Sequence, residues 1–308
     1  MIAGRILRVV AAVVLAACGA PAAESQTARP ETSRIIMLGT GMPVPDANAW
    51  GPATAIAMGD RLFLIDAGAG VTRRFAAAGY PRISKIDATF ITHLHSDHTL
   101  GYPDLIFTTW IMGRRDPLMV FGPPGLRRMT DRILDAWRED VEVRVHGLEH
   151  ETRASLAVNA REVRPGVVYS RDGVRVTAFK VRHTAWKNAF GYRFDLPDRS
   201  ITISGDTAPP SDDLIAAAKG TDVLIHGVYI ESRLTPEKRP GGEDWPAYMH
   251  AAHTSNVELG RLAARVQPKL LILNHVIRMG GTDDELIEGI RAGGYTGRVV
   301  IARDLDVF

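Results

Sequence analysis

The most informative stretch of this chain is Thr92-His93-Leu94-His95-Ser96-Asp97-His98. They follow an apolar, strand-like run and precede a stretch with helical character. Imidazole nitrogens and carboxylate oxygens are the ligands that Zn²⁺ takes at catalytic sites. Because side chains alternate along an extended segment, His93 and His95 point the same way, while Asp97 and His98 continue into the following turn. We therefore expect the first pair to face one metal ion and the second pair to face another ion beside it.

Outside this segment, short apolar strands alternate with helices in both halves of the chain. The strands arrive singly or as hairpins, one of them around Gly59-Asp60. This order predicts an α/β fold, built as an αββα four-layer sandwich in which helices cover the outer faces of two packed sheets. We expect strands at residues 35–38, 54–58, 62–65, 86–92, 118–121, 174–181, 189–194, 200–204, 223–226, 270–274 and 299–302, and helices at 71–78, 98–112, 126–137, 256–266 and 283–292.

The first 18 residues, MIAGRILRVVAAVVLAAC, are typical of a signal peptide. Two arginines precede an uninterrupted apolar run at residues 9–17, which is too short to span a bilayer. Leu15-Ala16-Ala17-Cys18 also resembles the processing box of bacterial lipoproteins, and Cys18 is the only cysteine, which excludes an intrachain disulfide. We expect an exported, periplasmic protein that meets the membrane only through a lipidated Cys18. Ordinary cleavage near residues 20–23 is the alternative.

Composition places the rest of the chain among ordinary globular proteins. The 308 residues are 45% hydrophobic and 23% charged, with a formal net charge of +2. Residues 19–33 are small, polar and contain proline, which predicts a flexible tether before one folded domain at 34–308. Cleavage before Cys18 would remove Arg5 and Arg8 and leave a side-chain charge of zero. This balance argues against a dedicated nucleic-acid-binding surface.

The histidine motif and its surroundings resemble the metallo-β-lactamase superfamily of hydrolases, in the branch that holds ribonuclease Z and its arylsulfatase-like and phosphodiesterase-like relatives. The resemblance runs from about Ile35 to the C-terminus, and the motifs occur in the order that the family uses. Besides the histidine motif and His183, they are Leu38-Gly39-Thr40-Gly41, Leu64-Ile65-Asp66-Ala67-Gly68-Ala69-Gly70, Gly122-Pro123-Pro124-Gly125, Phe190-Gly191-Tyr192-Arg193, Ser204-Gly205-Asp206-Thr207, His253-Thr254-Ser255 and Leu273-Asn274-His275.

Carried over to the matching positions, the resemblance implies a site for two divalent metal ions. Zn²⁺ is the expected metal for five histidines and two aspartates, although Mn²⁺ or Fe fits the same ligands. The residues themselves support this set, because polar side chains at strand ends tend to converge on one rim. The implied ligands are His93, His95 and His183 for the first ion, Asp97, His98 and His275 for the second, and Asp206 as a bridge between the two.

Other positions carry expectations about the chemistry. Asp97 and His253 are expected to take part in catalysis, with His253 placed to protonate the leaving group. Asp66 resembles the family aspartate that hydrogen-bonds the loop of the histidine motif and orients its ligands; a surface carboxylate in a glycine-rich turn is the alternative. One departure is clear, because ribonuclease Z has His-Glu-Ala-Thr where this chain has His226-Gly227-Val228-Tyr229.

The implied activity is hydrolysis by a hydroxide that bridges the two ions, since a bound Zn²⁺ lowers the pKa of water to about 7. Ribonuclease Z carries a long tRNA-gripping arm between its Gly-Tyr-Arg and Gly-Asp-Thr motifs, whereas residues 193–204 here form one short hairpin. We therefore expect a small ester substrate, a phosphodiester or an aryl sulfate first, and no nucleic-acid partner. The alternatives are a lactonase or β-lactamase-type hydrolase, a ribonuclease Z-like endoribonuclease, and a non-catalytic lipoprotein that keeps the fold. A homodimer is left open.

Aromatic residues near the predicted loops are candidates for a substrate pocket. Trp50, Trp110, Trp186 and Trp245 either line such a pocket or pack in the core. The long, polar segment at 231–248 is rich in Pro and Gly and is expected to form a mobile lid over the site.

Labelling of cells with a radioactive fatty acid tests the predicted export signal. We expect label on the wild-type protein in the membrane fraction and none on Cys18→Ser, because the serine hydroxyl replaces the thiol that carries the lipid. An unlabelled wild-type chain that begins near residues 20–23 in the periplasm would contradict the lipid anchor. An uncleaved chain in the cytoplasm would contradict export altogether.

Overall fold

The computed structural model describes residues 32–80, 83–237, 241–242 and 244–308. The predicted export signal, with Cys18, lies outside these residues. Ser33 precedes the first strand and is buried. Its backbone N–H and its hydroxyl both donate to the carboxylate of Asp198, at 2.8 and 2.9 Å, so the folded body holds this residue.

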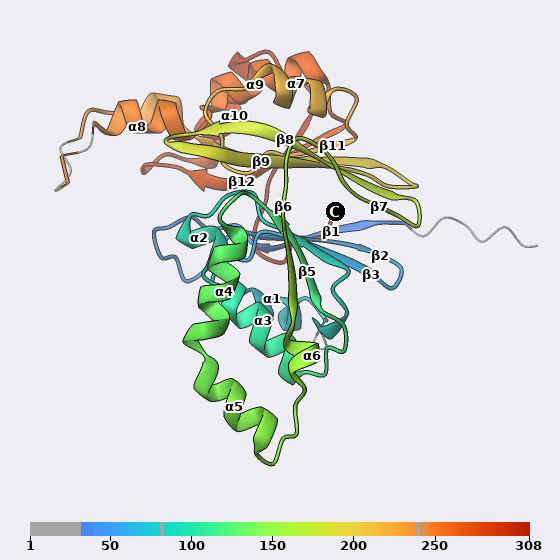
Figure 1. Ribbon diagram of the computed structural model, residues 1–308. Helices are drawn as coiled ribbons and strands as arrows, with labels where there is room; N and C mark the ends of the chain where they lie inside the picture. Colours follow the sequence, from blue (N-terminus) through green and yellow to red (C-terminus); the bar gives the residue numbers. More distant parts are fainter. Residues whose placement is uncertain (1–31, 81–82, 238–240, 243) are drawn as a thin grey trace, which may run out of the picture.

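Two sheets lie face to face at the centre of the molecule, with helices outside both (Figure 1). This arrangement confirms the predicted αββα sandwich. The first sheet has the order β1-β2-β3-β4-β5-β6, with β1 (Arg34–Gly39), β2 (Ala53–Met58), β3 (Arg61–Ile65), β4 (Ala88–Phe90), β5 (Leu118–Gly122) and β6 (Val158–Glu162). The second has the order β13-β12-β11-β10-β9-β8-β7, with β7 (Gly166–Arg171), β8 (Val174–His183), β9 (Trp186–Asp195), β10 (Ser200–Ile203), β11 (Val223–Tyr229), β12 (Leu270–Ile277) and β13 (Arg298–Ile301).

Helices α1, α3, α4, α5 and α6 lie below the first sheet in Figure 1, and α2 lies level with one end of that sheet. Helices α7, α9 and α10 lie above the second sheet, and α8 projects at one end. The helices are α1 (Val71–Ala77), α2 (Ser96–Thr99), α3 (Tyr102–Ile111), α4 (Leu126–Ala136), α5 (Arg138–His146), α6 (Arg153–Leu156), α7 (Asp212–Ala218), α8 (Trp245–Ala252), α9 (Asn256–Val266) and α10 (Asp283–Ala292), with short 3₁₀ helices η1 (Ile83–Lys85) and η2 (Glu231–Arg233).

Some elements differ from the sequence-based expectation. The helix expected at 98–112 is split into α2 and α3. Pro103 has no N–H to continue a helical ladder, and the N–H of Gly101 donates to the carbonyl of Ala67 at 2.9 Å instead. Helix α5 and strands β6 and β7 are not expected from the sequence. Only Val141 is buried on α5, and the two strands are largely exposed, so none of the three shows a regular apolar stripe.

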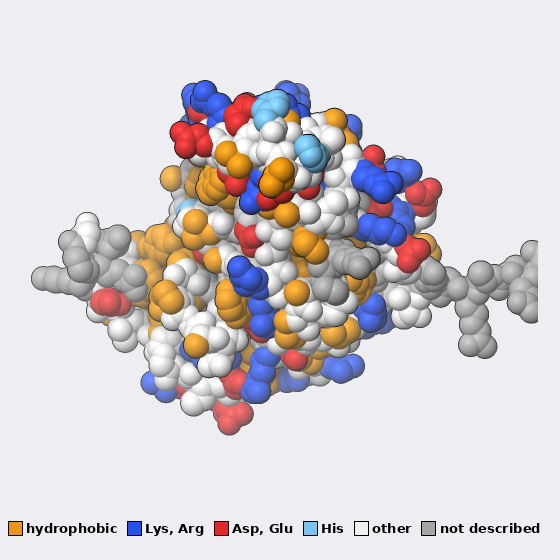
Figure 2. Space-filling view, turned by 90° about the horizontal axis from the view of Figure 1, so that it is seen from below, with side chains coloured by type: hydrophobic (Ala, Val, Ile, Leu, Met, Phe, Trp, Pro, Cys, Tyr) orange, Lys and Arg blue, Asp and Glu red, His pale blue; other side chains and the backbone are white. Residues whose placement is uncertain are grey.

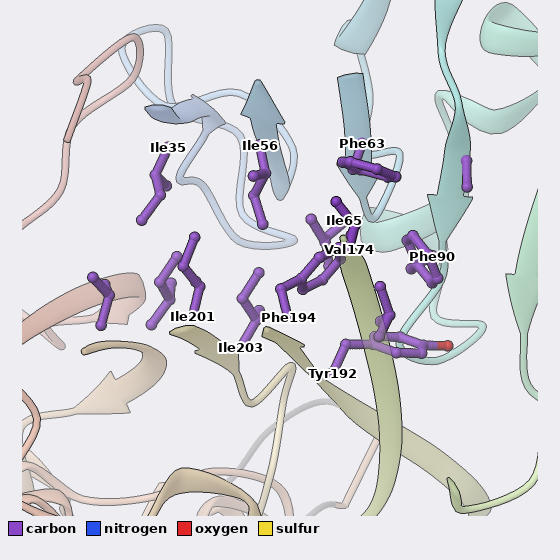
Figure 3. Packing of buried hydrophobic residues seen from close by; sticks show 14 of the residues in the cluster. Ile35, Ile56, Phe63, Ile65, Phe90, Val174, Tyr192, Phe194, Ile201 and Ile203 are labelled. Atoms are coloured by element: carbon purple, nitrogen blue, oxygen red, sulfur yellow. The ribbon is translucent and has the colours of Figure 1, made fainter. Parts of the chain in front are cut away.

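The main core fills the space between the two sheets (Figure 3). Phe63 and Phe90 reach into it from the first sheet, and Phe194 and Ile203 reach into it from the second. The ring of Phe90 stacks on Phe121 with centroids 5.2 Å apart and meets Phe194 edge-on at 5.3 Å. Aromatic packing of this kind fixes how the two sheets lie against each other, and therefore where their loops meet.

Strand ends from both sheets bring polar residues to one rim of the sandwich. Strand β4 ends just before the histidine motif, and β8 ends at His183. The register of β11 against β12 pairs Gly227 with Asn274 and Val228 with Val276, so His275 is left out of the pairing. His275 has a φ of 48°, as expected for a bulged residue whose side chain is redirected.

The outer surface is mixed in character. The face drawn in Figure 2 carries Lys and Arg side chains among Asp, Glu and apolar ones, in agreement with the small net charge of +2. Within the described residues, no helix combines the length and the hydrophobicity that a membrane crossing requires.

Replacing Phe90 by alanine tests the packing between the sheets, because this ring is completely buried. We expect the free energy of unfolding to fall by about 3–5 kcal/mol, the range for a buried Phe→Ala change. Urea unfolding followed by tryptophan fluorescence measures the difference. Val143→Ala, at an exposed position of α5, is the control and should change this energy by less than about 0.5 kcal/mol. Equal stability of the two variants would contradict this description of the core.

Candidate metal centre

Asp66 holds the loop of the histidine motif in place. Its buried carboxylate accepts hydrogen bonds at 2.8 Å from the backbone N–H of Thr92 and from the Thr92 hydroxyl. The same carboxylate lies 2.8 Å from Nδ1 of His98. Asp66 has a φ of 58°, a left-handed conformation that aspartate adopts more readily than most residues, and this turns its carboxylate toward the loop. The expected orienting role of Asp66 therefore has a geometric basis.

Three histidine nitrogens converge beside this loop. Nδ1 of His95 lies 3.1 Å from Nε2 of His93 and 3.0 Å from Nε2 of His183, which comes from the end of β8. Zn–N bonds of about 2.0–2.1 Å in tetrahedral geometry place two ligand nitrogens about 3.3 Å apart. The three nitrogens are therefore spaced like ligands of one ion.

A second group of donors adjoins the first and shares Asp206 with it. Nε2 of His275 is 3.2 Å from Oδ2 of Asp97 and 3.6 Å from Oδ2 of Asp206. Nε2 of His98 is 3.4 Å from Oδ2 of Asp97 and 3.6 Å from Oδ1 of Asp206. Asp206 also forms a group with His93 and His98 whose donor atoms lie within 4.8 Å of one another. The structure thus brings all seven predicted ligands together.

Fixed partners orient the imidazole rings of the first group. Nδ1 of His93 lies 3.0 Å from the Thr92 hydroxyl, and Nδ1 of His183 lies 2.7 Å from the carbonyl oxygen of Ala252. Such contacts determine which ring nitrogen carries the proton and which one is free to bind a metal ion. Sequence reasoning missed Thr92 and Ala252. Thr92 is the first residue of the quoted motif, but its role depends on the contact with Asp66, which is 26 positions earlier in the chain.

Burial keeps the imidazoles of the first group neutral. Desolvation lowers the pKa of His93 well below its ordinary value, and it lowers the pKa values of His95 and His183 as well. The neutral imidazole is the form that binds a metal ion. The environment of these three residues therefore favours metal binding at neutral pH.

The second group is rich in negative charge. Burial raises the pKa of Asp206, but His275 and His98 outweigh it and hold that pKa well below the ordinary value. Burial lowers the pKa of His98, yet Asp66 and Asp206 bring it well above the ordinary value. Nε2 of His98 is buried and has no hydrogen-bond partner among the described residues. Buried carboxylates need nearby positive charge, so this donor set fits a divalent metal ion.

His253 lies at the edge of the second group. Its Nδ1 is 3.9 Å from Oδ2 of Asp206, and its ring stacks on that of His275 with centroids 5.6 Å apart. Together with these two residues it forms a further group of donors within 4.8 Å. The structure therefore places both predicted catalytic residues, Asp97 and His253, at the metal centre.

A cavity of about 400 Å³ opens over these donors, within the usual size range of ligand pockets. Five of the metal-binding and catalytic candidates form its polar side, and apolar and aromatic side chains form the rest of its wall. The five are His95, Asp97, Asp206, His253 and His275. Trp245 and Tyr248 stack on each other there, with centroids 5.4 Å apart. Both belong to the segment expected to form a lid, so part of that segment borders the cavity.

The other tryptophans have different surroundings. Trp186, the first residue of β9, lies beside the first group with its ring centroid 5.2 Å from that of His95. Trp110 is fully buried in the core under the first sheet. Trp50 carries the guanidinium of Arg74 over its ring at 5.9 Å. Only Trp186 and Trp245 therefore fit the expectation of a tryptophan near the site.

Gly227 faces the metal centre. A Cβ at this position would lie 3.7 Å from Oδ1 of Asp206 and 3.7 Å from Cβ of His275, which is ordinary van der Waals contact. The neighbouring His226 is buried, and burial lowers its pKa to about 4, so it is neutral at pH 7. The departure from the His-Glu-Ala-Thr pattern therefore lies next to Asp206, at a position where a Cβ atom would fit.

Comparison with known proteins identifies the family. A family model described as the beta-lactamase superfamily domain matches residues 61–276. The chain belongs to the metallo-β-lactamase superfamily. Ribonuclease Z of Mycobacterium marinum is 32% identical over 277 residues, which cover 88% of this chain and 96% of that protein. Ribonuclease Z of Mycobacterium bovis is 31% identical over 276 residues, with the same coverage of both chains.

Solved structures of superfamily members share the fold. The short form of human tRNase Z has a TM-score of 0.67 and 20% identity, and the alignment covers 89% of this chain and 98% of that structure. The metallo-beta-lactamase fold protein YhfI from Bacillus subtilis has a TM-score of 0.66 and 20% identity, with 90% and 98% covered. At this identity, the similarity establishes the fold alone.

The prediction of a small-molecule ester substrate without a nucleic-acid partner is wrong. The relatives that match most of the chain are ribonucleases by name. A net charge near zero describes the whole surface, whereas binding of RNA requires only a few basic side chains near the site. The β9–β10 connection is indeed short, at residues 196–199, but it shows only that a long insertion is absent at that place.

Asp66→Asn tests whether Asp66 orients the loop of the histidine motif. We expect the affinity for Zn²⁺ to fall about 10- to 100-fold, as is typical when a partner of a ligating histidine is lost. Competition with a chromogenic chelator measures this affinity. Asp222→Asn is the matched control, because the Asp222 carboxylate also accepts from a backbone N–H, that of Ser200 at 2.7 Å. Asp222 lies just before the first residue of β11, whereas Gly227, which faces the metal centre, lies nearer the other end of this strand. Wild-type affinity in Asp66→Asn would contradict the orienting role.

Proposed function

We propose that the protein is a metal-dependent ribonuclease of the ribonuclease Z type, which hydrolyses phosphodiester bonds in RNA. One observation carries the proposal. Two adjoining groups of metal-binding side chains, with Asp206 between them, occur in a chain that is 31–32% identical to ribonuclease Z proteins over 88% of its length. Retention of every donor argues against a non-catalytic protein that merely keeps the fold.

Two divalent ions, with Zn²⁺ as the proposed metal, would supply a nucleophilic water at neutral pH and neutralise negative charge on the phosphate. The chain itself holds the donors at a fixed spacing, through Asp66 and Thr92 on one side and the carbonyl of Ala252 on the other. The cavity over the donors gives the RNA backbone access to them. Trp245 and Tyr248 offer an aromatic surface in that cavity on which a nucleobase can stack.

His253 is the side chain that we assign to the reacting phosphate. Burial lowers its pKa to about 3, although Asp206 raises it, so the free protein holds this imidazole neutral at pH 7. A neutral imidazole carries one N–H, which donates a hydrogen bond to a phosphoryl oxygen. Protonation of the leaving group by His253 would first require it to gain a proton. The role that this geometry supports is therefore stabilisation of charge that develops on the phosphate.

Cleavage of a structured RNA with a single-stranded 3′ extension tests the proposal. We expect His253→Ala to keep its metal and lose about 100- to 1,000-fold in kcat, the usual loss for one donor to a developing oxyanion. His95→Ala and Asp206→Ala should lose both metal and cleavage. Mass spectrometry of the products and elemental analysis of the protein provide the two readouts.

His146→Ala is the matched control, because this histidine is exposed on α5, and it should behave like wild type. Absence of RNA cleavage by the metal-loaded wild-type protein would contradict the proposed function. Undiminished cleavage by metal-free Asp206→Ala would contradict the metal site.

A further inference from the structure

We propose that the groove between α4 and Trp186, here called the α4 groove, binds single-stranded RNA that leads to the metal centre. This inference rests on the proposed function and names the surface that would guide its substrate. The groove has a volume of about 650 Å³. The side chains that matter for the argument are Leu94, Arg128, Met129, Arg132, Ile133 and Trp186, all of which line it.

The α4 groove and the metal centre share a wall. Trp186 lines the groove, and its ring meets that of His95 edge-on, with centroids 5.2 Å apart and an interplanar angle of 84°. Leu94 stands between the ligands His93 and His95 and lines the groove, because alternate side chains of an extended segment point to opposite sides. An RNA strand that leaves the metal centre on this side would pass directly over Trp186.

Two arginines supply the charge that such a strand requires. Arg128 and Arg132 are four residues apart on α4, so they lie on the same face of the helix. Both are exposed, and neither forms an ion pair or side-chain hydrogen bond with another residue in the described part of the chain. The adjacent Arg127, in contrast, donates to the carbonyl of Ala160 at 3.2 Å. The two groove arginines are therefore available to phosphates.

The remaining surface of the groove suits nucleobases. Met129 and Ile133 form an apolar row beside the two arginines on α4, and Trp186 adds an aromatic face that is partly exposed. A basic groove with an aromatic side chain is the usual site for a single strand, in which the bases are free to stack on the protein. The acidic residues of α4, Asp131 and Asp135, do not line the groove. Charge and shape therefore both favour a single RNA strand as the occupant.

Binding of a fluorescent oligoribonucleotide of about ten nucleotides, a length within the usual footprint of single-strand sites, tests the proposal. We expect the double variant Arg128→Glu/Arg132→Glu to bind at least about tenfold more weakly at low salt. Loss of two phosphate contacts should also reduce the slope of log K against log salt concentration by about 1.4. The matched control is Arg261→Glu/Arg265→Glu, which changes two exposed arginines with the same spacing on α9, outside the second sheet (Figure 1).

The aromatic wall is tested separately. Trp186→Ala should bind the oligoribonucleotide roughly 5- to 150-fold more weakly, the range for loss of one stacked base, while Trp186→Phe should retain most of the affinity. Metal content is measured on both variants, because Trp186 packs against His95. Loss of binding that follows loss of metal would assign Trp186 to the metal centre and contradict its place in the groove.

Hydrolysis of bis-p-nitrophenyl phosphate separates this proposal from the proposed function, since this small diester does not extend into the groove. The α4 double variant should hydrolyse it at the wild-type rate.

The possible outcomes distinguish the two proposals. Equal RNA binding by the α4 and α9 double variants would overturn the proposed role of the α4 groove and leave the proposed RNA cleavage untouched. Equal affinity for a duplex would overturn the single-strand assignment. Groove-dependent binding by a wild-type protein that cleaves no RNA would keep the groove and overturn the proposed function.

Discussion

The hydrogen bonds to the carboxylate of Asp66 are the contacts on which the metal centre depends. This buried group accepts from the backbone and the hydroxyl of Thr92 and contacts His98. A buried carboxylate is stable only when several donors surround it, so the loop that supplies these donors has one favourable conformation. In that conformation, His93 and His95 belong to the first group of metal-binding side chains and His98 belongs to the second. The link also joins the two strands that precede the loop, because Asp66 follows β3 and Thr92 follows β4.

The electrostatics of the protein are local rather than global. The formal net charge is only +2, and the face drawn in Figure 2 is mixed. The interior nevertheless gathers three aspartates, Asp66, Asp97 and Asp206, around the donors, where they favour bound cations. On the outside, Arg128 and Arg132 lack ion-pair partners among the described residues and lie beside the loop of the histidine motif. A protein with such local charge can bind a polyanion without a strongly basic surface. The small net charge was therefore not a valid reason to exclude a nucleic-acid partner.

Much of the architecture could be predicted because its signals are local. The segment before the histidine motif and the segment of β12 are short apolar runs, and helices α9 and α10 show a periodic apolar pattern. The structure has an element at each place. The signal is missing where an element buries little. Helix α5 buries only Val141, and β7 has no fully buried residue. Neither element therefore shows the periodic apolar pattern from which a helix or a strand is predicted. The single helix expected across Pro103 was wrong because the chain turns at Gly101 to bond with Ala67.

Apolar patterns and polar residues at strand ends were enough to predict the fold class and the chemical types of the donors, because both are local signals. The grouping of these donors could be predicted only through the family resemblance, and the contacts that bring them together are visible in the tertiary structure. His183 and His95 are 88 positions apart and their nitrogens lie 3.0 Å apart, and His275 and Asp97 are 178 positions apart with 3.2 Å between their donor atoms. The bulge at His275 and the approach of Trp186 to α4 likewise had no local signal. Contacts of this kind depend on how the two sheets pack around Phe90 and Phe194, and no pattern confined to neighbouring residues records that packing.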